Sequence, residues 1–195
     1  RIVIAADAGD LAGRASDLIT RLLNETPGRR ATLGLAGGST PRATYERLCT
    51  APVDWSRVDL WLSDERWVPP DHPDSNGRMA RETLADHIPA TFHPVPWFPN
   101  RPAEEAAAEY AATINRICGD RPDVVLLGMG DDGHTASLFP GRPALTAGGT
   151  SYVADLVPGK GPRLTATVGL LHSARHIVFL VAGATKAPVL AGVLD

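Results

Sequence analysis

Short apolar runs recur along this chain, and each is followed directly by glycine or charged residues. The runs are Ala31–Leu35, Val58–Leu62, Val124–Leu127 and residues 177–181. Apolar runs of this length are typical of strands that are buried on both faces of a sheet. Because helical patterns lie between them, we predict an α/β fold with a mostly parallel sheet.

The segments between these runs carry the remaining expected elements. Helices are expected over residues 11–22 and 103–117, and around residues 79–84 after an N-cap at Asp74 or Ser75. Further strands are expected at residues 2–5, 152–157 and 164–168, whereas Pro27-Gly28 breaks the first helix and residues 89–102 form a loop. In that loop we expect Trp97 and Phe98 to pack down on the protein rather than bind a ligand.

The composition limits the classes of function. The 195 residues are 44% hydrophobic and 21% charged, enough for one domain with a sizeable core. A net charge of −3 gives no general attraction to nucleic acid or an anionic membrane, so an anionic substrate needs a local cluster of cations. No apolar run approaches the roughly 20 residues of a spanning helix, and no secretory signal is visible. Because no targeting signal is visible, we predict a cytoplasmic protein, in which Cys49 and Cys118 are expected to be free thiols.

The stretch DVVLLGMGDDGHTASLFPG, residues 123–141, carries the strongest signal for a functional site. Asp132 and His134 stand two residues apart, so in an extended segment both side chains project to the same side. Open α/β sheets place their sites at the carboxyl ends of buried strands, which is where this pair lies. We therefore predict that Asp132 and His134 are catalytic; the alternative is a polar loop that caps the next helix. Gly128-Met129-Gly130 opens no long helix, so NAD binding is not expected.

A second candidate follows the run Ala31–Leu35. There Gly37, Gly38, Ser39 and Thr40 lead through Pro41 into a helical pattern. Pro41 suits the first helical position, and Ser39 or Thr40 suits the cap. The exposed N–H groups at this helix start would form a phosphate cradle, although an ordinary capped turn explains the pattern equally well.

Charged residues follow two further runs. Asp64 and Arg66 come after Val58–Leu62, and they either pair with each other or line the same cleft as Asp132 and His134. Arg163 and Lys186 would supply the cations that a phosphate needs, since Arg favours bidentate contacts and Lys acts as a point charge. The alternative is that each is a solvated surface cation.

Taken together, these segments resemble the 6-phosphogluconolactonase family, the lactone hydrolases of the oxidative pentose phosphate pathway. The matching segments follow the family's order: residues 37–41, 64–69, 74–76 and 128–140, then Arg163 with Thr165 and Thr167, and Gly183 with Lys186. The resemblance implies a Rossmann-like fold with helices on both faces of the sheet, a fold shared with glucosamine-6-phosphate deaminase. The family usually continues past Lys186 through another strand, so we expect residues 1–195 to be a single domain that is incomplete at its C-terminus.

The resemblance also implies the partners and the roles of the site residues. A phosphorylated sugar lactone is the substrate, with no cofactor or metal, and the chain is expected to be a monomer that binds neither nucleic acid nor membrane. A lactone carbonyl is electrophilic enough for water, so His134 is expected to act as general base on water while Asp132 orients the imidazole. The residues expected to bind substrate are Gly37, Gly38, Ser39, Thr40, Asp64, Arg66, Arg163 and Lys186. Of these, Gly38, Ser39, Thr40, Arg163 and Lys186 are expected to hold the 6-phosphate.

Two other functions are considered. A deaminase-isomerase of the same fold carries a Glu a few residues after the Asp-Gly-His segment, whereas this chain has Phe139, which cannot relay a proton. A non-catalytic sugar-phosphate sensor would need a helix-turn-helix arm or a basic patch, and the sequence shows neither.

Overall fold

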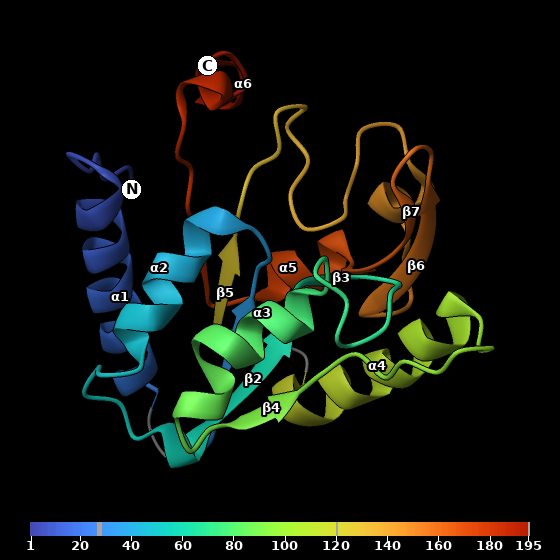
Figure 1. The fold of residues 1–195 in the computed structure, drawn as a ribbon, viewed down its shortest axis with the longest axis horizontal. Coiled ribbons are helices and arrows are strands. Elements are labelled where there is room, and N and C mark those ends of the chain that lie inside the picture. The colour runs from blue at the N-terminus through green and yellow to red at the C-terminus, as the bar shows by residue number, and fades with distance from the viewer. Residues whose placement is uncertain (27–28, 120, 195) are drawn as a thin grey trace.

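The computed structural model describes residues 1–26, 29–119 and 121–194, and it contains two sheets (Figure 1). The larger sheet is entirely parallel, with the strand order β4-β2-β1-β5-β8. Its strands are β1 Ala31–Leu35, β2 Val58–Leu62, β4 Thr91–His93, β5 Val124–Leu127 and β8 His176–Phe179. The prediction of an α/β fold with a mostly parallel sheet is confirmed.

Burial of the central strands explains why the apolar runs identified them. Every residue of β1, β2 and β5 is buried, so both faces of the sheet are covered, as the continuous runs predicted. All three have the predicted bounds. The last strand, β8, lies at the sheet edge, where Phe179 is 54% exposed, and it starts and ends earlier than the predicted residues 177–181.

Helices pack around this sheet, with one exception. They are α1 Ala8–Asn24, α2 Ser39–Leu48, α3 Asn76–Thr83, α4 Ala103–Cys118, α5 Val168–Ser173 and α6 Ala187–Leu194. The exception is α6, which has no buried residue and lies apart from the sheet in Figure 1. In Figure 1, α1 and α2 lie side by side at the left and α4 lies at the lower right. The first helix begins because the Asp7 carboxylate accepts the N–H of Asp10, and it buries Ala15 and Ile19 in the core.

A second, antiparallel sheet was not predicted. It pairs β3 Asp64–Arg66 with β7 Gly161–Ala166 and β7 with β6 Tyr152–Val157. Tyr152 joins it to the rest of the protein, since its hydroxyl donates to the Leu62 carbonyl at 3.1 Å and its ring meets Tyr110 of α4 edge-on at 4.8 Å. This sheet brings residues 64–66 and 163–165 together at the end of β2.

Two expected elements are wrong, a third ends earlier than predicted, and one lies outside the described residues. Residues 2–5 form no strand, and Ile4 is 87% exposed. The predicted loop 89–102 contains β4, a three-residue strand that pairs with β2 between flanking prolines. The predicted strand 164–168 stops at Ala166, because the Thr167 hydroxyl accepts the N–H of Leu170 and caps α5. The break at Pro27-Gly28 falls on residues that are not described.

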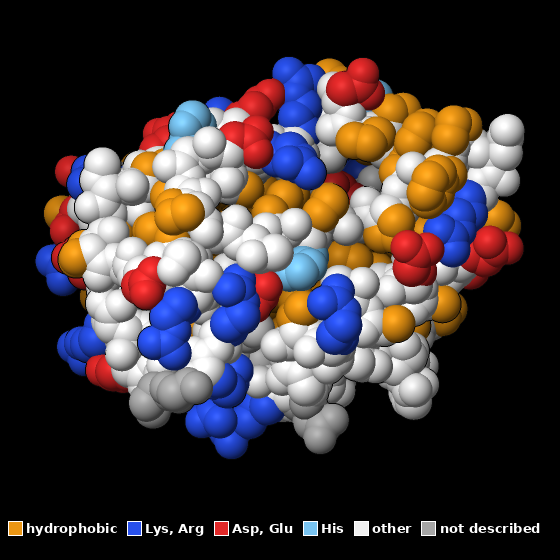
Figure 2. Space-filling model, turned by 90° about the horizontal axis from the view of Figure 1, so that it is seen from below, with side chains coloured by type: hydrophobic (Ala, Val, Ile, Leu, Met, Phe, Trp, Pro, Cys, Tyr) orange, Lys and Arg blue, Asp and Glu red, His pale blue; other side chains and the backbone are white. Residues whose placement is uncertain are grey.

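Surface composition agrees with the modest net charge. Figure 2 shows the face from which the parallel strands start, and its Lys and Arg side chains lie among acidic, apolar and uncharged ones. Within the described part of the chain, no helix has both the length and the apolar character that crossing a membrane requires.

Candidate active site

The predicted site residues follow strands whose carboxyl ends lie at one edge of the central sheet. The chain runs from β1 outward through β2 to β4 on one side, and then from β5 to β8 on the other. The adjacent strands β1 and β5 therefore form the switch point, where open α/β sheets leave a crevice for ligands. The segments directly after β1, β5 and β8 carry most of the residues predicted from sequence. Asp64 and Arg66 lie on β3, which follows β2, and Arg163 lies on β7.

A tight glycine turn after β5 holds the predicted catalytic pair. The N–H of Gly130 donates to the His134 carbonyl at 2.7 Å, and the N–H of Gly133 donates to the Gly130 carbonyl at 3.1 Å. A Cβ on Gly130 would lie 2.1 Å from the imidazole of His134, so no larger residue fits there. Because both N–H groups are used within the turn, neither of them is free to stabilise an oxyanion.

Asp132 and His134 are in direct contact, as the two-residue spacing predicted. The Asp132 carboxylate contacts Nδ1 of the imidazole and accepts the His134 N–H at 3.2 Å. Burial by itself raises the pKa of Asp132, but the hydrogen bonds from His134 outweigh it and lower the pKa below the ordinary carboxyl value. An ionised carboxylate on Nδ1 holds a proton there and leaves the lone pair on Nε2.

An aromatic ring and a lysine complete the surroundings of the imidazole. Phe139 stacks on His134 with ring centroids 4.1 Å apart and an interplanar angle of 28°. The ammonium of Lys160, from the β6–β7 hairpin, lies 4.8 Å from the Phe139 centroid. Sequence reasoning noted Phe139 only as the absence of a Glu and missed Lys160 altogether. The five-residue spacing between His134 and Phe139 gives no signal of a contact in an irregular loop.

The helix start after β1 differs from the predicted cap. Gly38, not Ser39 or Thr40, is the N-cap of α2, and no side chain bonds to the first N–H groups. Gly38 has φ of 104°, a backbone conformation that favours glycine. Ser39 and Thr40 are therefore the first two helical residues. The uncapped N–H groups and the positive end of the helix dipole make this turn able to bind an anion.

Asp64 and Arg66 do not pair with each other; they bind neighbouring loops. The Ser137 hydroxyl donates to Asp64 at 2.7 Å, which ties β3 to the loop that carries His134. Arg66 donates to the Asn76 side-chain oxygen at 2.7 Å, and Asn76 packs so closely on Gly37 that a Cβ there would lie 1.9 Å from it. Asn76 and Ser137 are thus positioning residues that sequence reasoning did not single out.

Two arginines are register partners on neighbouring strands of the second sheet. Arg66 and Arg163 are directly opposite in the antiparallel β3–β7 pair. Burial lowers the pKa of Arg163, and the like charge of Arg66 lowers it further. The Arg163 Nε is buried without a hydrogen-bond partner among the described residues. An unpaired buried donor beside a second cation favours binding of an anion.

Lys186 lies at the same edge but has a partner. Its ammonium contacts the Asp131 carboxylate at 2.8 Å, and the hydrogen bonds from Lys186 and Thr185 lower the pKa of Asp131. Asp131 is 73% exposed, so this pair is screened by water and a doubly charged phosphate can compete for the lysine. Among the described residues, neither Ser39 nor Thr40 bonds to Arg163 or Lys186.

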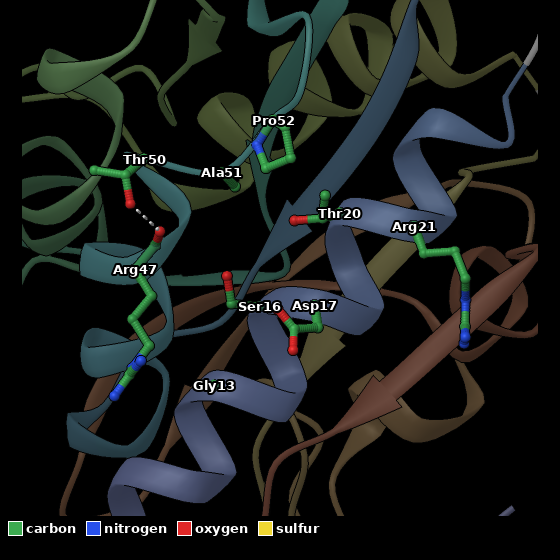
Figure 3. Close-up of a pocket in the computed structure, with 9 residues that line it drawn as sticks. All are labelled: Gly13, Ser16, Asp17, Thr20, Arg21, Arg47, Thr50, Ala51 and Pro52. Atoms are coloured by element: carbon green, nitrogen blue, oxygen red, sulfur yellow. Dashed lines mark hydrogen bonds between the residues drawn. The ribbon is translucent and has the colours of Figure 1, made fainter.

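One cavity lies away from these residues. It measures about 420 Å³ between α1 and α2, and Figure 3 shows its polar lining, which includes Asp17, Arg47 and Thr50. None of its nine lining residues is among the site residues predicted from sequence. In the described part of the chain, no three His, Cys, Asp or Glu side chains gather as metal ligands do.

Comparisons with known proteins agree with the resemblance drawn from sequence. The family described as glucosamine-6-phosphate isomerases/6-phosphogluconolactonase matches residues 6–195. A protein named 6-phosphogluconolactonase from Synechocystis is 44% identical to this chain, and the match covers 80% of this chain and 68% of that protein. A protein of the same name from Nostoc is 41% identical, and the match covers 98% of this chain and 84% of that protein. The crystal structure of a 6-phosphogluconolactonase from Shewanella baltica superimposes with a TM-score of 0.89 at 31% identity, over 97% of this chain and 84% of that one. The chain therefore belongs to the glucosamine-6-phosphate isomerase/6-phosphogluconolactonase family.

Proposed function

We propose that this protein hydrolyses 6-phospho-D-glucono-1,5-lactone to 6-phosphogluconate, with water activated by His134 and no metal. The observation that carries the proposal is the contact between Asp132 and the Nδ1 of His134 at the switch point of the sheet. The names of the relatives, 6-phosphogluconolactonase, support the choice of substrate.

In this mechanism Nε2 of His134 accepts a proton from water as the oxygen adds to the lactone carbonyl. The tetrahedral intermediate then collapses, the ring C–O bond breaks, and the imidazolium returns the proton to the leaving oxygen. Asp132 keeps the proton on Nδ1 and stabilises the imidazolium while it exists. No covalent nucleophile is required, because water attacks directly.

The 6-phosphate would be held by the cations and N–H groups around the crevice. Gly38, Ser39 and Thr40 present the uncapped start of α2, and Arg163 supplies a guanidinium donor that lacks a partner. Lys186 would exchange Asp131 for the phosphate. Arg66 is proposed to assist there or to position the sugar acid, with Asp64 and Gly37 shaping the pocket through Ser137 and Asn76.

Phe139 favours this reaction over deamination of an amino-sugar phosphate. Its ring stacks on His134, and by resemblance Phe139 stands at the position where the deaminases carry the Glu that relays a proton during ring opening. An aromatic hydrocarbon can neither donate nor accept that proton, so we propose no deaminase activity.

The phosphate contacts can be tested by separating binding from turnover. Lys186→Ala and Arg163→Ala should each raise KM for the phosphorylated lactone about 10-fold to 100-fold, the loss expected for one charge-assisted hydrogen bond, and should change kcat much less. Arg14→Ala is a matched control, because this exposed arginine on α1 pairs, among the described residues, with Asp10 alone. If Lys186→Ala and Arg163→Ala both keep the wild-type KM, the phosphate is bound elsewhere.

We also propose that the protein works as a monomer in the cytoplasm. Cys49 and Cys118 are free, and burial raises the pKa of the Cys118 thiol to about 12, which suits a reducing compartment. Sedimentation equilibrium of the active protein tests the monomer: a dimer mass at assay concentrations would contradict it.

A further inference from the structure

A second cavity, separate from the catalytic pair, lies between α3 and the segment of residues 94–98. It measures about 320 Å³, within the roughly 300–1,000 Å³ range of sites for small molecules. Pro70, Pro94 and Pro96 contribute to its wall, and their fixed φ angles keep the shape of the cavity in the absence of a ligand. Neither Asp132 nor His134 lines it.

The aromatic part of the wall comes from Trp67, Trp97 and Phe98. Trp67 and Trp97 meet with ring centroids 6.4 Å apart and an interplanar angle of 50°, so a flat ring cannot slide between them, since two parallel contacts need about 7 Å. A planar ligand would instead lie against the face of one indole. Phe98 is 54% exposed, which contradicts the expectation that it packs down on the protein.

The rest of the wall is cationic. Arg66, Arg78 and Arg81 line the cavity, and Glu65 is the single acid among the lining residues. The Glu65 carboxylate is buried and accepts the N–H groups of Asn76 and Gly77, both at 2.7 Å, so it points into the protein rather than into the cavity.

Two of the three guanidinium groups have weak or no acidic partners. Arg81 reaches Asp86 only at 3.4 Å, with both side chains at least half exposed, so this pair contributes little. Arg66 bonds to an amide and a carbonyl oxygen and to no carboxylate. Arg78, in contrast, contacts Glu82 at 2.6 Å. The cavity therefore combines two partly buried indole rings with a guanidinium group, that of Arg81, whose acidic partner is weak.

We propose that this cavity binds a planar aromatic anion of the nucleoside diphosphate class. The base stacks on Trp97 or Trp67, and the phosphates bind Arg81. Stacking on an aromatic side chain and bidentate contacts from guanidinium groups are the two interactions by which proteins bind such molecules without a dedicated fold. The site is independent of the proposed lactonase activity.

The test is calorimetric titration of the wild-type protein with ADP in the presence of saturating 6-phosphogluconate, which occupies the proposed substrate site. We expect one ADP per chain. Adenosine and inorganic pyrophosphate, which each carry half of the ligand, should bind at least tenfold more weakly than ADP. Trp97→Leu and Arg81→Gln should each weaken ADP binding by about tenfold, while lactone turnover stays at the wild-type level.

Arg47→Gln is the matched control, since Arg47 lies in the separate cavity between α1 and α2. Its affinity for ADP should equal that of wild type. Three results would each overturn the proposal: no heat of binding at millimolar ADP, equal ADP affinity in Trp97→Leu, Arg81→Gln and wild type, or displacement of ADP by 6-phosphogluconate.

Discussion

Replacing Asp132 with Asn or with Ala separates two roles of the carboxylate: it orients the imidazole of His134, and it keeps the imidazole proton on Nδ1. In the structure Asp132 contacts Nδ1 of His134 and accepts its backbone N–H. Alanine removes the orienting bond. Asparagine keeps the shape, but its amide can donate to Nδ1, which places the imidazole proton on Nε2 and removes the base.

The expected loss of kcat follows from the exposure of Asp132 to solvent. A hydrogen bond to a charged group contributes about 1.5–3 kcal/mol, and Asp132 is 47% exposed, which favours the lower half of that range. We therefore expect Asp132→Ala to lower kcat about 10-fold to 30-fold. Asp132→Asn should lower kcat further, to about 100-fold below wild type, because the wrong tautomer is added to the lost charge.

The assay is steady-state lactone hydrolysis, with Asp131→Asn as the matched control. Asp131 is the adjacent acid in the same loop, but it contacts Lys186 rather than His134. Its substitution should leave kcat within about twofold of wild type, since it touches no reacting group. The reasoning is refuted if Asp132→Asn keeps more kcat than Asp132→Ala, or if Asp131→Asn loses as much as either.

Two further substitutions test the surroundings of the site and the fold. Phe139→Leu should lower kcat about threefold to tenfold with little change in KM, because stacking on His134 is lost; an unchanged kcat in steady-state assays would show that the ring only fills space. At Asp59, burial raises the pKa, but hydrogen bonds from Arg30 and His93 outweigh burial, so the pKa lies below its usual value. The carboxylate therefore stabilises the fold above about pH 4, and this stabilisation is lost as the pH falls through the lowered pKa. In urea unfolding, Asp59→Asn should cost about 2 kcal/mol at pH 7 and less than about 1 kcal/mol near pH 2.5; a cost that does not depend on pH would contradict this assignment.

The central sheet was predictable because its strands carry their signal locally. In β1 and in β2 all five residues are buried and most are apolar, so each strand is visible as a short, mainly apolar run whatever the rest of the chain does; Thr32 and Asp59 are the polar exceptions. The contact between Asp132 and His134 was predictable for the same reason, since two-residue spacing is a local property.

Contacts between distant segments left no such signal. The Asp64–Ser137 bond joins residues 73 apart in sequence, and the Arg66–Arg163 register depends on a second sheet whose pairing no periodicity reveals. The cap of α2 was misplaced because Ser39 and Thr40 are common caps, whereas the positive φ of Gly38 is a property of the folded backbone.

The most direct test of the account is the decay of freshly generated 6-phosphogluconolactone. Decay is followed without protein, with wild type and with His134→Ala, and circular dichroism confirms that the variant is folded. The account predicts that wild type accelerates decay above the spontaneous rate and that His134→Ala lowers turnover by roughly 10²–10⁴, the usual contribution of a general base. Equal acceleration by wild type and His134→Ala would remove His134 from the mechanism, and no acceleration by folded wild type would contradict the lactonase function itself.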